Sequence, residues 1–358
     1  MPEPEQYAYP NWVEAQNLPI YEGYHIEDLR KIELGPWSDR ECNAAFLLLE
    51  GQQGVSEARV TEIAPGHTMP ALKFSFDEVV YVVEGQGICT VWHEDGPKHS
   101  FEWQKHGLFL LPRNHYHQFA NARGDQRALL FHNNYLPLAM ACAPDPELYF
   151  SNPWPGVHRI DQSEFYSEAK VVEETNPRLK ARRRAYWKGN FFPDMRVWDK
   201  LVPFKGRGAG GKTIFIDFPG SPMSCHMSVF DAGTYKKGHR HGPSYVIVIP
   251  TGEGYSIMWP EGGEKVIVPW SEASVFVPPD NWYHQHFNVG GEPARYLALH
   301  PPRPFAKSGI AGNQIEYPDE ESFIRERFES ELARRGLRSL MPDEAYRDKD
   351  YEWSYVES

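Results

Sequence analysis

Short apolar runs of strand length, separated by Gly, Asp and Pro, fill residues 36–150 of this chain. Some runs alternate apolar with polar residues and others are continuously apolar, as in strands that are half-buried or fully buried. They are AAFLLLE at 44–50, EARVTEI at 57–63, DEVVYVVEG at 77–85, GICTVWH at 87–93, LFLLPR at 108–113, HQFAN at 117–121 and RALLFHNN at 127–134. The pattern predicts a first domain of short β-strands joined by tight turns.

A second series of such runs occupies residues 214–302. It begins with TIFIDF and ends with ARYLALH, and turn residues again separate the runs. Residues 1–35 carry Tyr, Trp and Pro with little periodicity, so we expect an extended arm that packs on the body. Residues 151–213 show no sustained strand pattern and are expected to be an inter-domain linker. The strand patterns and turn residues together predict an all-β protein of two domains.

The segment 303–358 contains the one convincing helix, PDEESFIRERFESELARRG. Pro318 and the following acids are typical of a helix start, and Gly336 is typical of a helix end. Between them Ile324, Phe328 and Leu332 lie four residues apart, which places them on one stripe. We therefore expect a C-terminal helix on the surface of a domain or a subunit.

The two β regions resemble each other. DEVVYVVEGQG at 77–87 aligns with SYVIVIPTGEG at 244–254, and LPRNHYHQFAN at 111–121 aligns with PPDNWYHQHFN at 278–288. Such an internal repeat indicates a duplicated unit. We expect each half to be a barrel of about eight strands.

Composition narrows the function classes. The 358 residues carry 37 Lys and Arg against 49 Asp and Glu, a net charge of -12 that repels phosphate backbones and anionic lipid. Nucleic-acid and membrane partners are therefore not expected, and no apolar run is long enough to span a bilayer. The four cysteines form no CxxC pair, and the N-terminus resembles no secretory signal, so we expect a cytoplasmic protein.

Three histidines carry the clearest chemical signal. In an extended segment side chains alternate between faces, so His239 and His241 point to the same side while Arg240 points away. His284, in PDNWYHQHFN, supplies a third imidazole from a distant strand. Three imidazoles bind a divalent metal and leave about half of its coordination sphere open for a substrate or oxygen.

Both halves resemble the cupins, small jelly-roll barrels with a Gly-led HxHxxxE segment and a later PxGxxH segment. The second half has the corresponding residues Gly233, His239, His241, Gly252, Pro279, Asn281, His284 and Asn288. The resemblance covers roughly 200 residues and implies two tandem jelly-roll barrels. It also implies a small-molecule substrate, and we expect a homo-oligomer, either a dimer or a tetramer.

The two halves have lost different ligands of the usual cupin site, which has three His and one Glu. In the first half Glu78 and His117 remain, but Leu72 and Phe74 stand where the two early histidines should be. Two ligands hold a divalent ion poorly, so we expect no metal in this half. A rearranged site using His67, His115 and His132 stays open. In the second half Tyr245 replaces the carboxylate.

The strings HRHGPSYVIVIPTGEG and PDNWYHQHFN also resemble the gentisate and salicylate ring-cleaving dioxygenases, two-cupin enzymes with a three-histidine iron site. This resemblance favours Fe(II) over Mn, Ni, Co or Zn. This chain departs from that family in two respects, because the family uses its first barrel for the metal and holds the substrate carboxylate with an arginine where this chain has Ile247. The second departure argues against a gentisate-like carboxylated substrate. We expect Tyr245 and His286, which share the inward face of the site, to serve as catalytic residues. His226 is a weaker candidate of the same kind.

The first hypothesis is therefore an iron-dependent dioxygenase that uses dioxygen to cleave a carbon–carbon bond of a small oxygenated substrate, with aromatic compounds among the candidates. The alternatives are a non-redox isomerase, lyase or decarboxylase on the same site, and a small-molecule-binding cupin with a structural metal. GRGAGGKT at 206–213 matches a phosphate-loop pattern, but a strand rather than a helix follows it. We expect a flexible inter-domain turn there.

Overall fold

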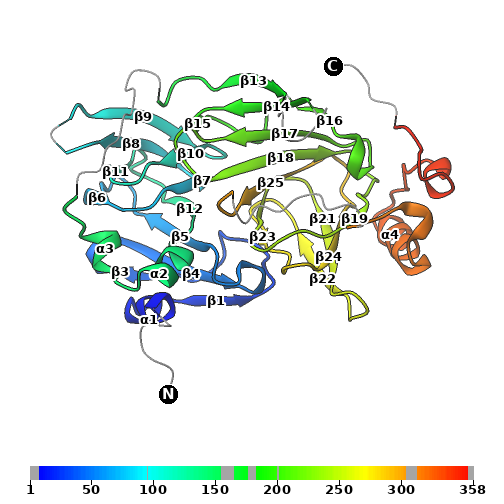
Figure 1. The fold of residues 1–358 in the computed structure, drawn as a ribbon, viewed down its shortest axis with the longest axis horizontal. Coiled ribbons are helices and arrows are strands. Elements are labelled where there is room, and N and C mark those ends of the chain that lie inside the picture. Colours follow the sequence, from blue (N-terminus) through cyan, green and yellow to red (C-terminus); the bar gives the residue numbers. More distant parts are fainter. Residues whose placement is uncertain are drawn as a thin grey trace.

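A computed structural model describes residues 8–94, 96–154, 165–175, 183–199, 201–303 and 313–353. They form two β-barrels that lie side by side, each built from a larger and a smaller sheet (Figure 1). The all-β prediction is confirmed, and the described helices are few and short. No helix in the described part of the chain combines the length and the apolar character that crossing a membrane requires.

The first barrel holds most of its strands at the predicted places. Its larger sheet has the order β4 (Cys42–Leu49), β5 (Glu57–Ile63), β12 (Ala128–Asn134), β7 (Glu78–Glu84) and β10 (Leu108–Leu111). Its smaller sheet has the order β6 (Leu72–Lys73), β11 (Tyr116–Asn121), β8 (Gln86–Trp92) and β9 (His99–Gln104).

The second barrel repeats this order strand for strand. Its larger sheet contains β17 (Lys212–Asp217), β18 (Ser224–Phe230), β25 (Ala294–His300), β20 (Val246–Thr251) and β23 (Val275–Phe276). Its smaller sheet contains β19 (Gly238–His239), β24 (Tyr283–Asn288), β21 (Gly254–Trp259) and β22 (Val266–Trp270). The identical strand order confirms the internal repeat.

The segment in front of each barrel adds a strand to the other barrel. β2 (His25–Ile26) extends the second barrel beside β23, and β15 (Phe191–Phe192) extends the first barrel beside β10. β1 (Ile20–Gly23) and β3 (Gly35–Trp37) both pair with β4. The described part of the expected arm over 1–35 thus packs on the body through backbone pairing with both barrels.

The expected linker also contains strands. β13 (Lys170–Thr175) pairs with β14 (Arg183–Lys188). β14 and β16 (Val202–Pro203) both pair with the edge of β17 that β18 leaves open, β14 near its C-terminal end and β16 near its N-terminal end. The absence of a sustained strand pattern over 151–213 was a misleading signal, because β13 and β14 are rich in charged residues and β16 has only two residues, so none shows the apolar alternation that marks buried strands.

Four α-helices lie in the described residues. They are α1 (Ala8–Ala15), α2 (Leu136–Cys142), α3 (Glu147–Phe150) and α4 (Ser322–Arg334). α4 is the predicted C-terminal helix, and it buries Ile324, Phe328 and Leu332. β26 (Gln314–Ile315) precedes it and pairs with β19, so the C-terminal segment rests against the second barrel (Figure 1).

The two larger sheets share one apolar core. Buried residues of the first barrel, including Leu47, Val60 and Val79, belong to the same cluster as Val246, Val248 and Leu297 of the second. Each fully buried aliphatic side chain contributes about 1.5–3 kcal/mol, so this shared core ties the barrels together. Alternate residues of β20 face this core, whereas Ile247 packs inside the second barrel, where Tyr245 shares its parity.

Candidate metal centre

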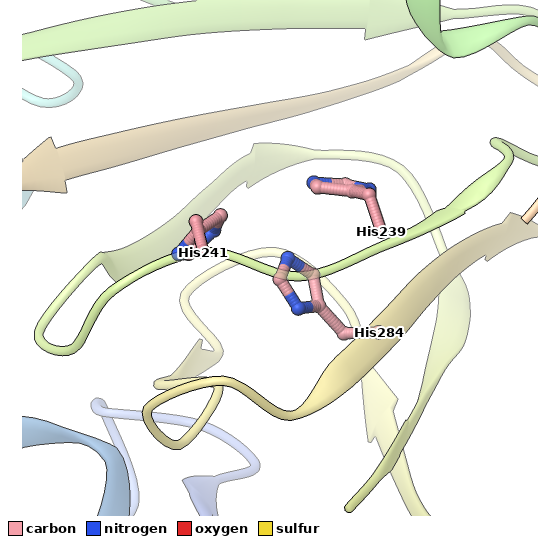
Figure 2. Close-up of side chains that lie close together, drawn as sticks. All are labelled: His239, His241 and His284. Atoms are coloured by element: carbon pink, nitrogen blue, oxygen red, sulfur yellow. The ribbon is translucent and has the colours of Figure 1, made fainter. Parts of the chain in front are cut away.

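The fold brings His239, His241 and His284 together, as predicted (Figure 2). β19 pairs with β24 so that His239 lies directly opposite His284, and His241 follows two residues after β19. The imidazole ring centroids are 4.3 Å apart for His239 and His284, and 4.6 Å apart for His241 and His284. The three candidate ligand atoms lie within 4.8 Å of one another.

Backbone carbonyls fix the tautomer of each ring. Nδ1 of His239 lies 3.2 Å from the carbonyl oxygen of Lys237, and Nδ1 of His284 lies 3.2 Å from that of Trp282. Nδ1 of His241 lies 2.8 Å from the carbonyl oxygen of Gly242. A carbonyl only accepts, so each Nδ1 must donate its proton, which leaves the lone pair on each Nε2.

The site suits a metal ion chemically. Burial lowers the pKa of His239 and His284 well below the usual value and that of His241 to about 4, so the imidazoles are neutral near pH 7. Nε2 of His284 is buried and has no hydrogen-bond partner. A buried acceptor without a partner is costly, and a divalent ion would satisfy it. Within the described residues no other group of His, Cys, Asp or Glu side chains offers three such ligand atoms.

Two cations lie beside the histidines, the half-buried Arg207 and the buried Lys236, and no sequence pattern indicated either. The positive charge of Arg207 contributes to the lowered pKa of each of the three histidines. Its Nη1 donates to Oε1 of Gln314 at 2.7 Å, and Gln314 pairs with His239 across β26 and β19. Among the described residues, no carboxylate forms an ion pair with Arg207.

Lys236 is the second cation and is only 1% exposed. Its Nζ donates to Oγ of Ser228 at 2.6 Å and lies 5.1 Å from the ring centroid of Tyr296. Burial lowers its pKa. Within the described part of the chain its charge also has no acidic partner, so the interior of the second barrel is electropositive.

The loop that carries Arg207 is the segment with the phosphate-loop pattern. β17 follows it directly, so the geometry of a phosphate loop is absent, as expected. It is not the free turn that we expected, however. The backbone nitrogen of Lys237 donates to the carbonyl of Arg207, and a side chain on Gly211 would meet Nζ of Lys236 at 3.2 Å. The loop is therefore tied to the segment that leads into β19.

The predicted catalytic residues lie next to the triad. The ring centroid of Tyr245 is 4.0 Å from that of His241, and the ring of His286 is 5.5 Å from that of His284. Nδ1 of His286 lies 2.8 Å from Oγ of Ser256, and burial lowers the pKa of His286 to about 3. Both positions are compatible with the proposed roles, which stay predictions.

His226 joins a second polar group inside the barrel. Its Nδ1 lies 2.7 Å from Nε2 of His300, whose Nδ1 lies 3.1 Å from Oγ of Ser224. The ring of His300 is 4.8 Å from that of Tyr245. Sequence reasoning missed His300, because it ends a strand that contains no ligand motif. These residues extend the polar lining from the triad toward the larger sheet.

The corresponding place in the first barrel is filled by an ion-pair network. Leu72 pairs with His117 in the register that joins His239 to His284, which supports the alignment of the two halves. Nη2 of Arg59 lies 2.7 Å from Oε2 of Glu78, and Nδ1 of His132 contacts the same oxygen at 2.7 Å. The retained carboxylate is therefore neutralised by a guanidinium.

Comparisons with known proteins address the fold. No family model and no curated protein matches the chain. A mutant of Bacillus subtilis oxalate decarboxylase superposes with a TM-score of 0.51 at 13% identity, over 80% of this chain and 79% of that one. Lactobacillus farciminis oxalate decarboxylase in complex with formate gives 0.51 at 14% identity, over 80% and 88%.

The chain has the fold of a two-barrel cupin. This confirms the bicupin resemblance and the fold class predicted for the chain. The matched structures are decarboxylases, so they do not support the narrower likeness to ring-cleaving dioxygenases. At these identities the likeness shows the fold alone.

Proposed function

We propose that this bicupin is a metal-dependent decarboxylase of a small carboxylate, with its active site in the second barrel. His239, His241 and His284 would hold one divalent ion through their Nε2 atoms. The observation that carries the proposal is the combination of this triad with two cations, the half-buried Arg207 and the buried Lys236, that lack acidic partners among the described residues.

The charge of the site favours an anionic substrate. Three neutral imidazoles leave a divalent ion its full charge, and Arg207 and Lys236 add two more positive charges nearby. A guanidinium donates two parallel hydrogen bonds to a carboxylate, which fixes the orientation of a bound acid. The loss of an arginine at Ile247 argued against a carboxylate on sequence grounds, but Arg207 could supply the same chemistry from another segment.

Within this proposal, each residue has a distinct task. Arg207 binds and orients the carboxylate of the substrate, and Lys236 keeps the barrel interior electropositive. Tyr245 and His286 donate or accept protons at the substrate oxygens and carbon. A bound divalent ion of this kind supplies Lewis acidity that stabilises developing negative charge.

The net reaction follows from these tasks. The bond between the carboxylate and its neighbouring carbon breaks, and CO₂ leaves. The electron pair stays on that carbon, which takes up one proton. Oxalate is the first substrate to test, because the matched structures are oxalate decarboxylases and a small dianion suits a cationic site. Its products would be formate and CO₂.

A second candidate is the dioxygenase of the sequence analysis. It is favoured by the absence of a carboxylate ligand, because Tyr245 occupies the position of the usual glutamate and three histidines leave positions open for both substrate and oxygen. Iron would be the metal required for it.

The test is to identify the bound metal and then measure CO₂ release and net oxygen consumption in parallel, over oxalate, 2-hydroxy acids, 2-oxo acids and catechols. The proposal expects CO₂ release without net oxygen consumption, and loss of turnover on chelation. One oxygen consumed per turnover supports the dioxygenase instead. A bound metal with no turnover of any of these compounds favours a binding protein with a structural metal and overturns the enzyme proposals.

A further inference from the structure

A cleft opens on the first barrel, away from the histidine triad. It has a volume of about 650 Å³ and lies over the dismantled metal position, since Leu72 and Phe74 are among its lining residues. The aromatic side chains that line the cleft also include Trp12, Trp37, Tyr116 and Phe150. Trp12 stacks on Phe150, with ring centroids 4.8 Å apart. The rest of the wall is polar, with Gln16, Asp39, Arg40, Lys73, Glu94, Ser151 and Asn152. A concave site in which aromatic surface meets convergent polar groups is typical of small-molecule binding.

Arg40 is the polar group of this cleft that points to a ligand. Arg40 is only 7% exposed, yet it lines the cleft. The carbon of its guanidinium lies 3.6 Å from the ring centroid of Trp37 and 4.9 Å from that of Phe74. These rings cover the faces of the guanidinium, but its N–H donors lie in its plane. Among the described residues no group accepts a hydrogen bond from Arg40 or forms an ion pair with it.

The charged residues around Arg40 do not form an ion pair with its guanidinium. Burial, together with the nearby positive charge of Arg59, lowers the pKa of Arg40 to about 9. The nearest acids, Glu57 and Glu78, are already hydrogen-bonded to Arg59. The other cation of the cleft, Lys73, pairs with Glu94 at 2.5 Å. Arg40 is therefore the one lining cation, within the described chain, whose donors remain available.

We propose that this cleft binds an aromatic or similarly planar monocarboxylate, whose carboxylate accepts hydrogen bonds from Arg40 and whose apolar part lies between the aromatic walls. A carboxylate matches the planar fork of one guanidinium, whereas phosphate sites commonly gather several cations or backbone amides. The cleft thus gives the barrel without the three-histidine site a ligand of its own, and the proposal does not depend on chemistry in the second barrel.

Calorimetric titration of the full-length protein with benzoate tests this proposal, with benzamide as the neutral isostere. We expect one benzoate site whose affinity falls about tenfold to a hundredfold in Arg40→Gln, because charge-assisted hydrogen bonds are lost. Benzamide should bind at least about tenfold more weakly than benzoate to the parent protein, for the same reason.

Three further variants locate the site. Arg338→Gln makes the same charge change at an exposed position and should leave the affinity unchanged. Arg207→Gln alters the second barrel and should also leave it unchanged. Ala71→Trp, at an exposed position on the rim of the cleft, should block benzoate, and it gives an independent test should Arg40→Gln fail to fold.

Three outcomes of these titrations contradict a carboxylate site at Arg40. No benzoate binding, equal binding of benzoate and benzamide, or binding that is lost in Arg207→Gln but kept in Arg40→Gln would each overturn the proposal. None of these results refutes turnover in the second barrel, and the last of them would support carboxylate binding at Arg207, so failure here and failure of the proposed function are distinguishable.

Discussion

Glu320 should make the protein less stable as pH rises through the neutral range. This carboxyl lies outside the second barrel, between the barrel and the C-terminal segment. The hydroxyl of Tyr235 donates to its Oε2 at 2.8 Å, and Nε2 of Gln285 donates to its Oε1 at 2.7 Å. Burial outweighs these hydrogen bonds and the nearby charge of Lys237, and it raises the pKa of Glu320 from 4.5 to about 8.

The sign and the size of this change in the free energy of unfolding follow from proton linkage. Between these two pKa values the folded protein retains a proton that the unfolded chain has released, so the free energy of unfolding falls as pH rises. The loss is about 1.4 kcal/mol per pH unit, or about 2 kcal/mol between pH 6 and pH 7.5. The loss is complete above the folded pKa. Below the unfolded pKa, both states are protonated and Glu320 adds no pH dependence.

The variant Glu320→Gln keeps a neutral hydrogen-bonding side chain at this position but removes the carboxyl group that titrates. Urea unfolding of the parent and the variant at pH 6, 7 and 8 should show a difference in stability that grows with pH in favour of the variant. Glu321→Gln, at an exposed neighbouring position, makes the same charge change and should follow the parent. If the free energy of unfolding changes with pH in the same way for the parent and Glu320→Gln, the pKa of Glu320 is not raised in the folded protein.

Three other predictions concern the two barrels. His241→Ala should lose the bound divalent metal measured by elemental analysis, because only two donors remain; retention of full occupancy would rule out the proposed ligand set. Arg207→Gln should keep the metal but raise KM for oxalate or another accepted carboxylate at least about tenfold, and an unchanged KM would contradict carboxylate binding there. Arg59→Met should lower the free energy of unfolding by about 3–5 kcal/mol in urea titrations, because it leaves two buried carboxylates unpaired. Equal stability of this variant and the parent would show that the network is not stabilising.

Several local features were predictable because they depend on neighbours in the sequence. The spacing of His239 and His241 put both imidazoles on one side of an extended segment, and the four-residue spacing in α4 placed Ile324, Phe328 and Leu332 on the buried stripe. The internal repeat was also visible, since strand patterns and turn residues recur in the same order.

Other features depend on which distant segments meet, and one sequence does not reveal that. The strands β2 and β15 each pair with the opposite barrel, and such pairs form through backbone groups that every residue carries. The guanidinium of Arg59 in β5 reaches Glu78 in β7 past the intervening strand β12, and a single ion pair leaves no spacing pattern in the chain.

The fold class, the duplication and the three histidines could be inferred from the sequence alone, because strand periodicity and ligand spacing are local properties of the chain. The tertiary structure decided the charge of each site. It placed Arg207 and Lys236 beside the triad, set Arg59 against the retained Glu78, and left Arg40 without a partner among the described residues in an aromatic cleft. Electrostatic environment depends on distance and burial in three dimensions, and only the folded chain brings these charges together.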